Sequence, residues 1–369
     1  MITTVFLPAP LDDCDWCREV LATTHYQTVE IQDHALKSEG ASLAALTPLE
    51  GAVTPGLLVT LDAAMLKRLA ALYEISGATP SELTVQSAGE SIPAIAFFSS
   101  AGQFVGQQLD PITALILRSA SSEIIALAAS FSSEALQTRW PMALAHAASV
   151  QRAQSAPNPA TCRAAWHRAD VTSIDHKRPY AWFFGVMEED LRFQRFDGSL
   201  GPQVKRAGFV MSDAVTVLPY DPRRDCVLVI EQFRFALWLR GAENCWSLEP
   251  IAGRVDPFET PTECALREAR EEAHLVLERD KLVSVGNVYP SPGAITEFLF
   301  QFVALCDLPD STETVAGLES EAEDIRSHVI SFEKLMSLIA TGEAQNGPLV
   351  LSAYWLAANR ADLRKQALG

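Results

Sequence analysis

Residues 253–275 read GRVDPFETPTECALREAREEAHL, and this stretch decides the fold of the C-terminal half of the chain. Thr260 or Thr262 can cap a helix, since a hydroxyl accepts a hydrogen bond from the first free N–H groups, and Pro261 suits the first turn. The apolar positions that can pack inward are Leu266, Ala269 and Ala273. The stretch therefore predicts an amphipathic helix that begins near Pro261.

Three carboxylates share one face of this predicted helix. Glu268 and Glu272 are four residues apart, and Glu271 lies alongside them. Clustered carboxylates raise one another's pKa unless a cation neutralises them. Hard oxygen ligands at this spacing suit Mg²⁺ or Mn²⁺, which in turn suit a phosphate substrate. The simpler alternative is a solvated acidic helix face, but the preceding LEPIAG segment and the two arginines in the helix favour a site.

The spacing of the charged residues resembles the Nudix box, G-x5-E-x7-R-E-U-x-E-E-x-G-U, in which U is apolar. Eight of the nine specified positions fit, and Ala269 and Leu275 fill the apolar ones. His274 stands where the box has its last glycine, which ends the helix in a left-handed conformation. Histidine adopts that conformation at a steric cost, so we expect a modest loss of stability and no loss of function.

Four further segments resemble the ADP-ribose pyrophosphatase branch of the Nudix hydrolases. They are IEQFRF (230–235), LEPIAG (248–253), YPSPGAITE (289–297) and EAEDIRSHVIS (321–331). The resemblance implies metal-dependent hydrolysis of ADP-ribose to AMP and ribose 5-phosphate, with two or three Mg²⁺ or Mn²⁺ ions per site. Two alternatives stay open: hydrolysis of another nucleoside-diphosphate sugar, and a non-catalytic regulator that senses ADP-ribose or a related nucleotide. The intact glutamates favour an enzyme.

The same resemblance implies a role for individual residues. The catalytic residues would be Glu321, as the general base, and Glu271. The metal ligands would be the carbonyl of Ala252 and the carboxylates of Glu268, Glu271, Glu272 and Glu323. The substrate contacts would be Arg234, Glu297, Ser291, Pro292 and Arg206, the last beside Lys205. The structural residues would be Gly253 and the ion pair of Glu259 with Arg267.

The composition of the chain limits its partners and its compartment. A net charge of −17 over 369 residues argues against nucleic acid or an anionic membrane as a main partner, while a small anionic substrate can bind through metal. There is no apolar run long enough for a transmembrane helix and no signal-like N-terminus. Seven scattered cysteines without a secretion signal indicate reduced thiols in the cytoplasm, and we interpret Cys14 and Cys17 as structural.

The pattern of apolar residues predicts two domains. Residues 1–148 form the first, the polar and proline-containing residues 149–173 form a linker, and residues 174–369 form the second. We expect an α/β/α sandwich with a mixed sheet in the second domain, within an overall α+β or α/β chain. A continuous helix is expected from Asp110 to Ala135.

The first domain resembles the gamma-glutamylcyclotransferase-like fold, a small β-barrel with helices. PGLLVTLDAAMLKRLAALYEISG (55–77) fits its later part and places Glu74 at the position of the catalytic acid. Pro8 and Pro10 occupy the first turn, where free N–H groups are needed, so we expect a degenerate domain. Bacterial proteins that join such a domain to a Nudix domain include some labelled as tellurite-resistance proteins.

A homodimer is also expected, because enzymes of the resembled branch pair through strands that precede the box. The candidate segment is 180–196, YAWFFGVMEEDLRFQRF, whose aromatic rings suit an interface or stacking on a base. The alternative is that these rings fill the core of the monomer.

Overall fold

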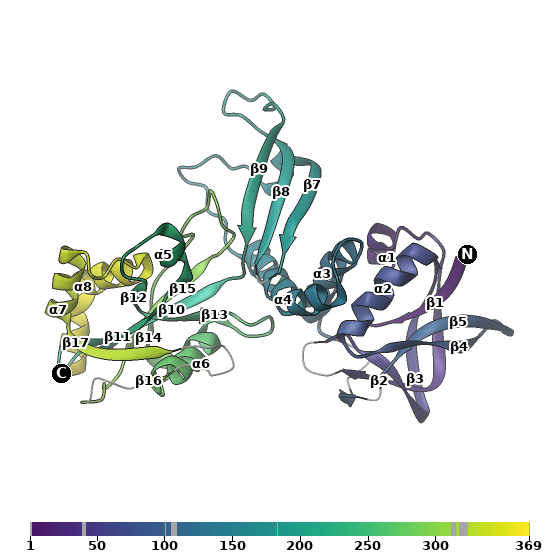
Figure 1. Cartoon of the computed structure of the whole chain (residues 1–369), viewed down its shortest axis with the longest axis horizontal. Coiled ribbons are helices and arrows are strands. Elements are labelled where there is room, and N and C mark those ends of the chain that lie inside the picture. Colours follow the sequence, from purple (N-terminus) through teal and green to yellow (C-terminus); the bar gives the residue numbers. More distant parts are fainter. Residues whose placement is uncertain are drawn as a thin grey trace. The chain divides into compact units, whose positions relative to one another are not determined.

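The computed structural model describes residues 2–38, 42–99, 101–104, 109–182, 184–310, 315–316 and 324–368. The chain divides into two compact units, Met1–Met211 and Ser212–Gly369 (Figure 1). The boundary between these units lies after the expected linker, because the strands of residues 171–210 belong to the first unit. No helix in the described ranges is long and apolar enough to cross a bilayer.

A six-stranded mixed sheet forms the first part of the N-terminal unit, in the order β4-β5-β1-β3-β2-β6 with an additional β5–β3 pairing. The strands are β1 (Ile2–Pro8), β2 (Tyr26–Ser38), β3 (Ala45–Asp62), β4 (Thr79–Ser87), β5 (Glu90–Phe98) and β6 (Gln103–Phe104). Strand β2 was not anticipated from the sequence. Its pairing with β3 contains a bulge next to Asp33, where φ is +59°, and this bulge interrupts the alternation of apolar residues.

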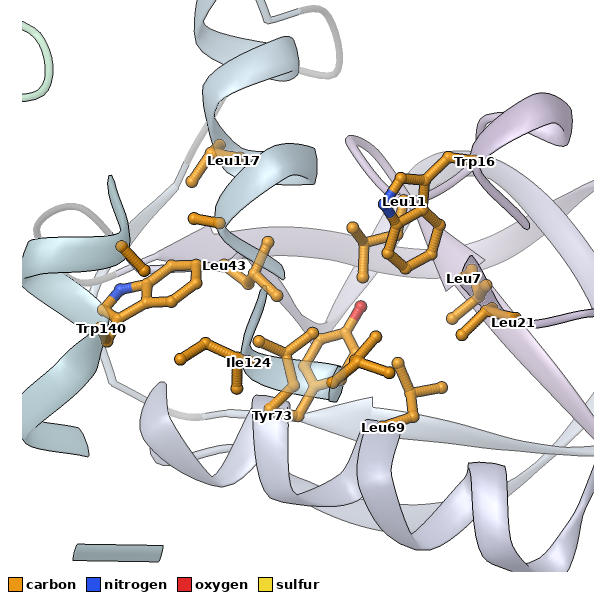
Figure 2. Packing of buried hydrophobic residues seen from close by; sticks show 14 of the residues in the cluster. Leu7, Leu11, Trp16, Leu21, Leu43, Leu69, Tyr73, Leu117, Ile124 and Trp140 are labelled. Atoms are coloured by element: carbon orange, nitrogen blue, oxygen red, sulfur yellow. The ribbon is translucent and has the colours of Figure 1, made fainter. Parts of the chain in front are cut away.

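Helix α2 (Ala63–Ile75) packs on this sheet, and α1 (Cys14–Val20), α3 (Pro111–Leu127) and α4 (Ser133–Ser155) complete the same core. Asp62 caps α2 by accepting a 2.8 Å bond from the N–H of Met65, which confirms the predicted start of that helix. The core between sheet and helices includes Tyr73, which stacks on Phe97 with ring centroids 4.1 Å apart. Figure 2 shows Tyr73 among leucine side chains and the two tryptophans Trp16 and Trp140.

The prediction of one continuous helix over residues 110–135 was wrong. Helix α3 ends at Leu127 and α4 begins at Ser133, because Ser132 caps the second helix by accepting a hydrogen bond from the N–H of Ala135. Helix α4 then continues to Ser155, so the first seven residues of the expected linker, 149–155, are helical. The alanines that follow Pro141 favour helix over linker.

A separate antiparallel sheet of three strands ends the N-terminal unit, in the order β7-β8-β9. Its strands are β7 (Val171–Ala181), preceded by the short 3₁₀ turn Arg168–Asp170, β8 (Gly185–Phe193) and β9 (Val204–Val210). Most residues of β7 are exposed, whereas Ala181, Gly185 and Val210 at one end of the sheet are buried. This sheet thus differs from ordinary antiparallel sheets, which cover one face.

The C-terminal unit contains an eight-stranded mixed sheet, which confirms the expected mixed topology. Its central path is β14-β15-β10-β11-β17-β16, with β12 added to β11 and β13 added to β10. Strands β10 and β15 are parallel, and the other pairings are antiparallel. The strands are β10 (Ala214–Asp221), β11 (Cys226–Phe233), β12 (Trp246–Glu249), β13 (Ile251–Arg254), β14 (Leu282–Val288), β15 (Leu299–Leu305), β16 (Val315–Ala316) and β17 (Ile325–Ser331).

Helices cover both faces of this sheet. On one face, α6 (Pro261–Ala273) packs its alanines and Cys264 against alternate residues of β10 and β11. On the other face, α7 (Phe332–Thr341) and α8 (Gly347–Leu368) pack against the intervening residues. The short helix α5 (Phe235–Arg240) and the 3₁₀ turn Arg279–Lys281 complete the unit. The face that carries α6 is the one that positions the box residues.

Helix α8 is tied to the tip of the β10–β11 hairpin by a partly buried charge cluster. The carboxylate of Asp225 accepts hydrogen bonds from Arg360, with Nε at 2.7 Å, and from the hydroxyl of Tyr220 at 2.8 Å, and it pairs with Arg364 at 2.5 Å. Burial alone would raise the pKa of the Asp225 carboxyl, but the bonds from Arg360 and Tyr220 and the charge of Arg364 lower it overall.

Candidate functional site

Local signals at both ends define the box helix α6. The hydroxyl of Thr260 accepts a bond from the N–H of Glu263, and the Glu263 carboxylate accepts one from the N–H of Thr260 at 3.0 Å, so Thr260 rather than Thr262 is the cap. At the other end, His274 has φ 53° and ψ 27°. The expected left-handed ending is therefore confirmed, with histidine in the conformation that usually favours glycine.

Gly253 lies where strand β13 meets the side chain of Glu268. A Cβ atom at position 253 would lie 1.8 Å from Oε1 and 2.0 Å from Cδ of Glu268. Gly253 is not among the residues with positive φ, so glycine is needed here for space rather than for backbone conformation. The missing side chain lets the Glu268 carboxylate lie directly against the backbone of β13.

Arg267 is the centre of the charged cluster. Its Nε and Nη2 each lie 3.0 Å from one oxygen of Glu259, and its Nη1 donates to Glu268 at 2.7 Å and to Glu271 at 2.9 Å. Burial alone would lower the pKa of the guanidinium, but the Glu259 hydrogen bond and the nearby carboxylates raise it overall. One arginine thus gathers three of the acidic residues around the box and neutralises part of their charge.

Glu272 occupies the most enclosed position of the cluster. Only 3% of its surface is exposed, and its Oε2 accepts a 2.9 Å bond from the backbone N–H of Ala252. A buried carboxylate is costly unless it is hydrogen-bonded or paired with a cation. The bond also places the Ala252 peptide beside the carboxylates of α6.

Arg234 is held by a partner that the sequence analysis did not single out. Its Nε donates to the two carboxylate oxygens of Glu249 at 3.0 and 3.1 Å, and its Nη2 donates to Oε2 at 2.6 Å. Glu249 is only 4% exposed, whereas the Arg234 side chain is 42% exposed. The clue in the sequence was a glutamate with apolar neighbours in the LEPIAG segment, at the end of strand β12.

A second pair of acids lies at the start of the parallel strands β10 and β15. The N–H of Ala214 donates to the carbonyl of Phe298 at 3.0 Å, so Asp213 and Glu297, which directly precede these two residues, lie at the same end. Asp213 is 3% exposed. Burial raises the pKa of Glu297, the charge of Arg234 lowers it and the charge of Asp213 raises it, with a net upward shift. Asp213, like Glu249, was missed at the sequence level.

The other residues that we expected in the site have no described contact with the acids of α6. Ser291 and Pro292 lie in an exposed turn, in which the Ser291 carbonyl accepts from the N–H groups of Ala294 and Ile295 at 3.0 Å. Arg206 is exposed on β9 of the N-terminal unit, and the neighbouring Lys205 pairs with Asp190 at 2.7 Å. Glu321 and Glu323 lie outside the described residues.

The donor atoms gathered at α6 and β13 fit a divalent cation. Carboxylates and a backbone carbonyl are hard oxygen ligands of the kind that Mg²⁺ and Mn²⁺ prefer, and the small Gly253 keeps Glu268 against β13. Within the described ranges, no three His, Cys, Asp or Glu side chains are already close enough together to hold a metal ion. In this arrangement the cation beside Glu268 and Glu271 is the guanidinium of Arg267.

Two features of the N-terminal unit bear on the other expected sites. Glu74 is exposed and accepts a 3.0 Å bond from the hydroxyl of Ser133, whereas its neighbour Tyr73 points into the core. Cys17 is fully buried, and burial raises the pKa of its thiol to about 12. A thiol with so high a pKa is a poor nucleophile at neutral pH.

Comparison with known proteins identifies the class of the C-terminal unit. Residues 211–352 match the NUDIX domain family, and the chain belongs to the NUDIX family of hydrolases. Such hydrolases generally depend on a divalent metal.

The relatives are more specific. The chain is 34% identical over 197 residues to the ADP-ribose pyrophosphatase of Escherichia coli (strain K12). The aligned region covers 53% of this chain and 92% of that enzyme. The chain is 31% identical over 198 residues to the ADP-ribose pyrophosphatase of Haemophilus influenzae, covering 53% and 90%. It is 34% identical over 152 residues to a GDP-mannose pyrophosphatase of Escherichia coli (strain SMS-3-5 / SECEC), covering 41% and 77%. A solved ADP compounds hydrolase aligns with 20% identity and a TM-score of 0.38, over 52% of this chain and 96% of that one.

Proposed function

We propose that the chain hydrolyses the pyrophosphate bond of ADP-ribose to give AMP and ribose 5-phosphate, with two or three Mg²⁺ or Mn²⁺ ions per site. The observation that carries this proposal is the group of acids on α6: Glu268 and Glu271 pair with Arg267, and Glu272 accepts a bond from the N–H of Ala252 on β13. The cluster occurs in a chain that is similar to ADP-ribose pyrophosphatases over about nine-tenths of their length.

The chemistry of the residues assigns them to two roles, metal binding and catalysis. A bound divalent cation would neutralise the diphosphate and acidify the attacking water. The ligands that would hold it are the carbonyl of Ala252 and the carboxylates of Glu268, Glu271, Glu272 and Glu323. Glu321 is the proposed general base, which would accept the proton of the attacking water, and Glu271 is the second proposed catalytic residue.

Substrate binding falls to the residues around Arg234. The buried carboxylate of Glu249 fixes one edge of the guanidinium, which can then meet a diphosphate or a ribose. Glu297 contacts the terminal ribose, and burial raises the pKa of its carboxyl while the charge of Arg234 opposes that shift. Ser291 and Pro292 are further substrate contacts in this proposal.

GDP-mannose is the second candidate substrate, because GDP-mannose pyrophosphatases are also among the relatives. Both substrates have a diphosphate between a nucleoside and a sugar, so the carboxylate cluster serves either reaction. A panel of nucleoside-diphosphate sugars with Mg²⁺ separates the two. The proposal requires kcat/KM for ADP-ribose to exceed that for GDP-mannose at least tenfold, and the reverse order would replace it.

The enzyme assay needs a variant that damages the site and one that does not. Glu272→Gln should abolish turnover, since losing one buried charge of the cluster typically costs several kcal/mol, about 10²-fold or more in rate. Glu278→Gln alters an exposed acid outside the cluster and should behave as wild type. Near-normal turnover of Glu272→Gln at saturating Mg²⁺ would show that the site is elsewhere.

A regulator that binds ADP-ribose without turnover is the remaining alternative. It predicts tight binding of ADP-ribose with no release of AMP from the wild-type protein at saturating Mg²⁺ or Mn²⁺. The buried Glu272 is an argument against it, because a binder that needs no metal has no use for an enclosed acidic cluster.

We also propose a cytoplasmic homodimer, with segment 180–196 at the interface. The rings of Tyr180, Trp182 and Phe193 are 40–47% exposed, and that of Phe196 is 90% exposed, so they do not fill the core of the monomer. Light scattering on the full-length protein tests this proposal, and a protein that is monomeric in solution would contradict it.

The first part of the N-terminal unit is proposed to be a degenerate gamma-glutamylcyclotransferase-like domain. The exposed Glu74 supports this, because a catalytic acid has to face a substrate pocket.

A further inference from the structure

The β7–β9 sheet is attached to the helices of the N-terminal unit at one end. The row at this end consists of Ala181, Gly185 and Val210, which are register partners across the three strands. Ala181 and Val210 are each 3% exposed, and Ala181 belongs to the same hydrophobic core as the inner residues of α3 and α4. By contrast, Val171 and Ile174, which lie toward the other end of β7, are 45% and 48% exposed.

Arg139 of α4 fills the space under this row. Its side chain is 2% exposed, and its Nε lies 2.6 Å from Oε1 of Glu123 on α3. A Cβ atom added at Gly185 would lie 3.0 Å from Nη2 and 3.4 Å from Cζ of Arg139, and 3.2 Å from Cβ of Val210. Gly185 does not have a positive φ, so the reason for glycine at this position is the close approach of the guanidinium.

A buried ion pair such as Arg139–Glu123 is unusual where only packing stability is needed. Nη1 of Arg139 is buried and has no hydrogen-bond partner among the described residues, and a buried unpaired donor lowers stability. A well-packed apolar pair would often stabilise such a core better than a buried ion pair, whose best-attested use is to select one arrangement of the packed elements. The Arg139–Glu123 pair, which lies against Gly185, is therefore suited to fix the position of strand β8 on the helices.

We propose that Arg139 is a positioning residue, through which the N-terminal helices hold the β7–β9 sheet in one orientation for self-association. The role of this unit is then to support a sheet that has no covered face of its own. A three-stranded sheet without a packed face is marginal in water, so it needs such a fixed end. The self-association part of the inference rests on the proposed homodimer, whereas the seating of the sheet does not.

Hydrogen–deuterium exchange on the full-length protein tests the seating directly. Gly185→Ala should speed exchange in peptides from β7, β8 and β9 at least tenfold while β1 and β3 keep their protection. Gly347→Ala is the matched control, because a Cβ at that position meets no atom within 4 Å. Equal loss of protection in β1 and β3 would mean general destabilisation, and it would contradict a specific role of Arg139 in holding the β7–β9 sheet.

A second variant covers the case in which Gly185→Ala alone fails to fold. Arg139→Met combined with Glu123→Met removes the ion pair without leaving one charge unpaired, and it should speed exchange in the same three strands. Unchanged exchange there in both variants overturns the proposal.

Analytical ultracentrifugation then separates the two parts of the inference. If the wild type is a dimer, its dissociation constant should rise at least tenfold in both variants, and an unchanged constant would remove the link to self-association. If the wild type is a monomer, the dimer proposal fails, while the exchange experiment still decides whether Arg139 seats the sheet.

Discussion

Replacing Gly253 by alanine should disable the site while leaving the fold in place. The added Cβ would lie 1.8 Å from Oε1, 2.0 Å from Cδ and 2.6 Å from Cγ of Glu268, so the Glu268 side chain has to move. It is the flexible end of a side chain, and it can rotate away from strand β13. The movement breaks the 2.7 Å bond to Nη1 of Arg267.

The two effects of this substitution have different sizes. A charge-assisted hydrogen bond contributes about 1.5–3 kcal/mol, and partial exposure of the Arg267 side chain reduces the expected loss of stability to about 1–2 kcal/mol. Loss of a preorganised charged group at the reacting centre typically costs about 10²–10³-fold in kcat. We therefore expect a folded protein with a kcat lowered about 100-fold or more.

The assay is turnover of ADP-ribose with Mg²⁺, followed alongside thermal unfolding. Gly347→Ala serves as control, since no atom lies within 4 Å of its added Cβ. The reasoning is refuted if Gly253→Ala keeps a kcat within threefold of wild type, because Glu268 would then not need its position against β13. If Gly253→Ala no longer unfolds cooperatively, the loss of activity would be due to loss of the folded structure instead.

The other predictions concern the general base Glu321, the exposed Glu74 of the N-terminal unit, and Asp225, which pairs with arginines of α8. Glu321→Gln should depress kcat far more than KM, since a base acts on the chemical step, and a rise in KM alone would make Glu321 a substrate contact. Glu74→Gln should change nothing in a cyclotransferase assay, where release of 5-oxoproline by the wild type, lost in the variant, would contradict a degenerate domain. Asp225→Asn should lower the free energy of unfolding by about 1–2 kcal/mol at pH 7 in denaturant titrations. The pKa of Asp225 is lowered in the fold, so this stabilisation is present above the unfolded pKa of about 4 and is lost as pH falls through the folded pKa. A difference between wild type and variant that does not shrink at low pH would count against the role of Asp225.

Interactions between near neighbours in the chain were predictable. The box spacing, the capping role of Asp62 and the turn at His274 each depend on residues within a few positions of one another. Local sequence contains all the information that such elements need. The failure at residues 110–135 has a local cause as well, because Ser132 offers a cap in the middle of a stretch with helical periodicity.

The contacts that organise the site were not predictable in this way. Glu249 lies 15 residues from Arg234, and the bond from the Ala252 N–H to Glu272 spans 20 residues. Such pairs depend on the register between β11 and β12 and on the packing of α6 against β13, for which a single sequence carries no direct signal.

The sequence by itself determined that the C-terminal half carries three clustered carboxylates on a capped helix, because helical periodicity places residues four apart on one face. Only the tertiary structure decided which groups surround them. Glu272 accepts a bond from the N–H of Ala252 on β13, and Gly253 makes room for Glu268, because these contacts form when separate elements pack together. The seat of the β7–β9 sheet on Arg139 is likewise a consequence of packing, since it joins residues that the chain separates by 46 positions.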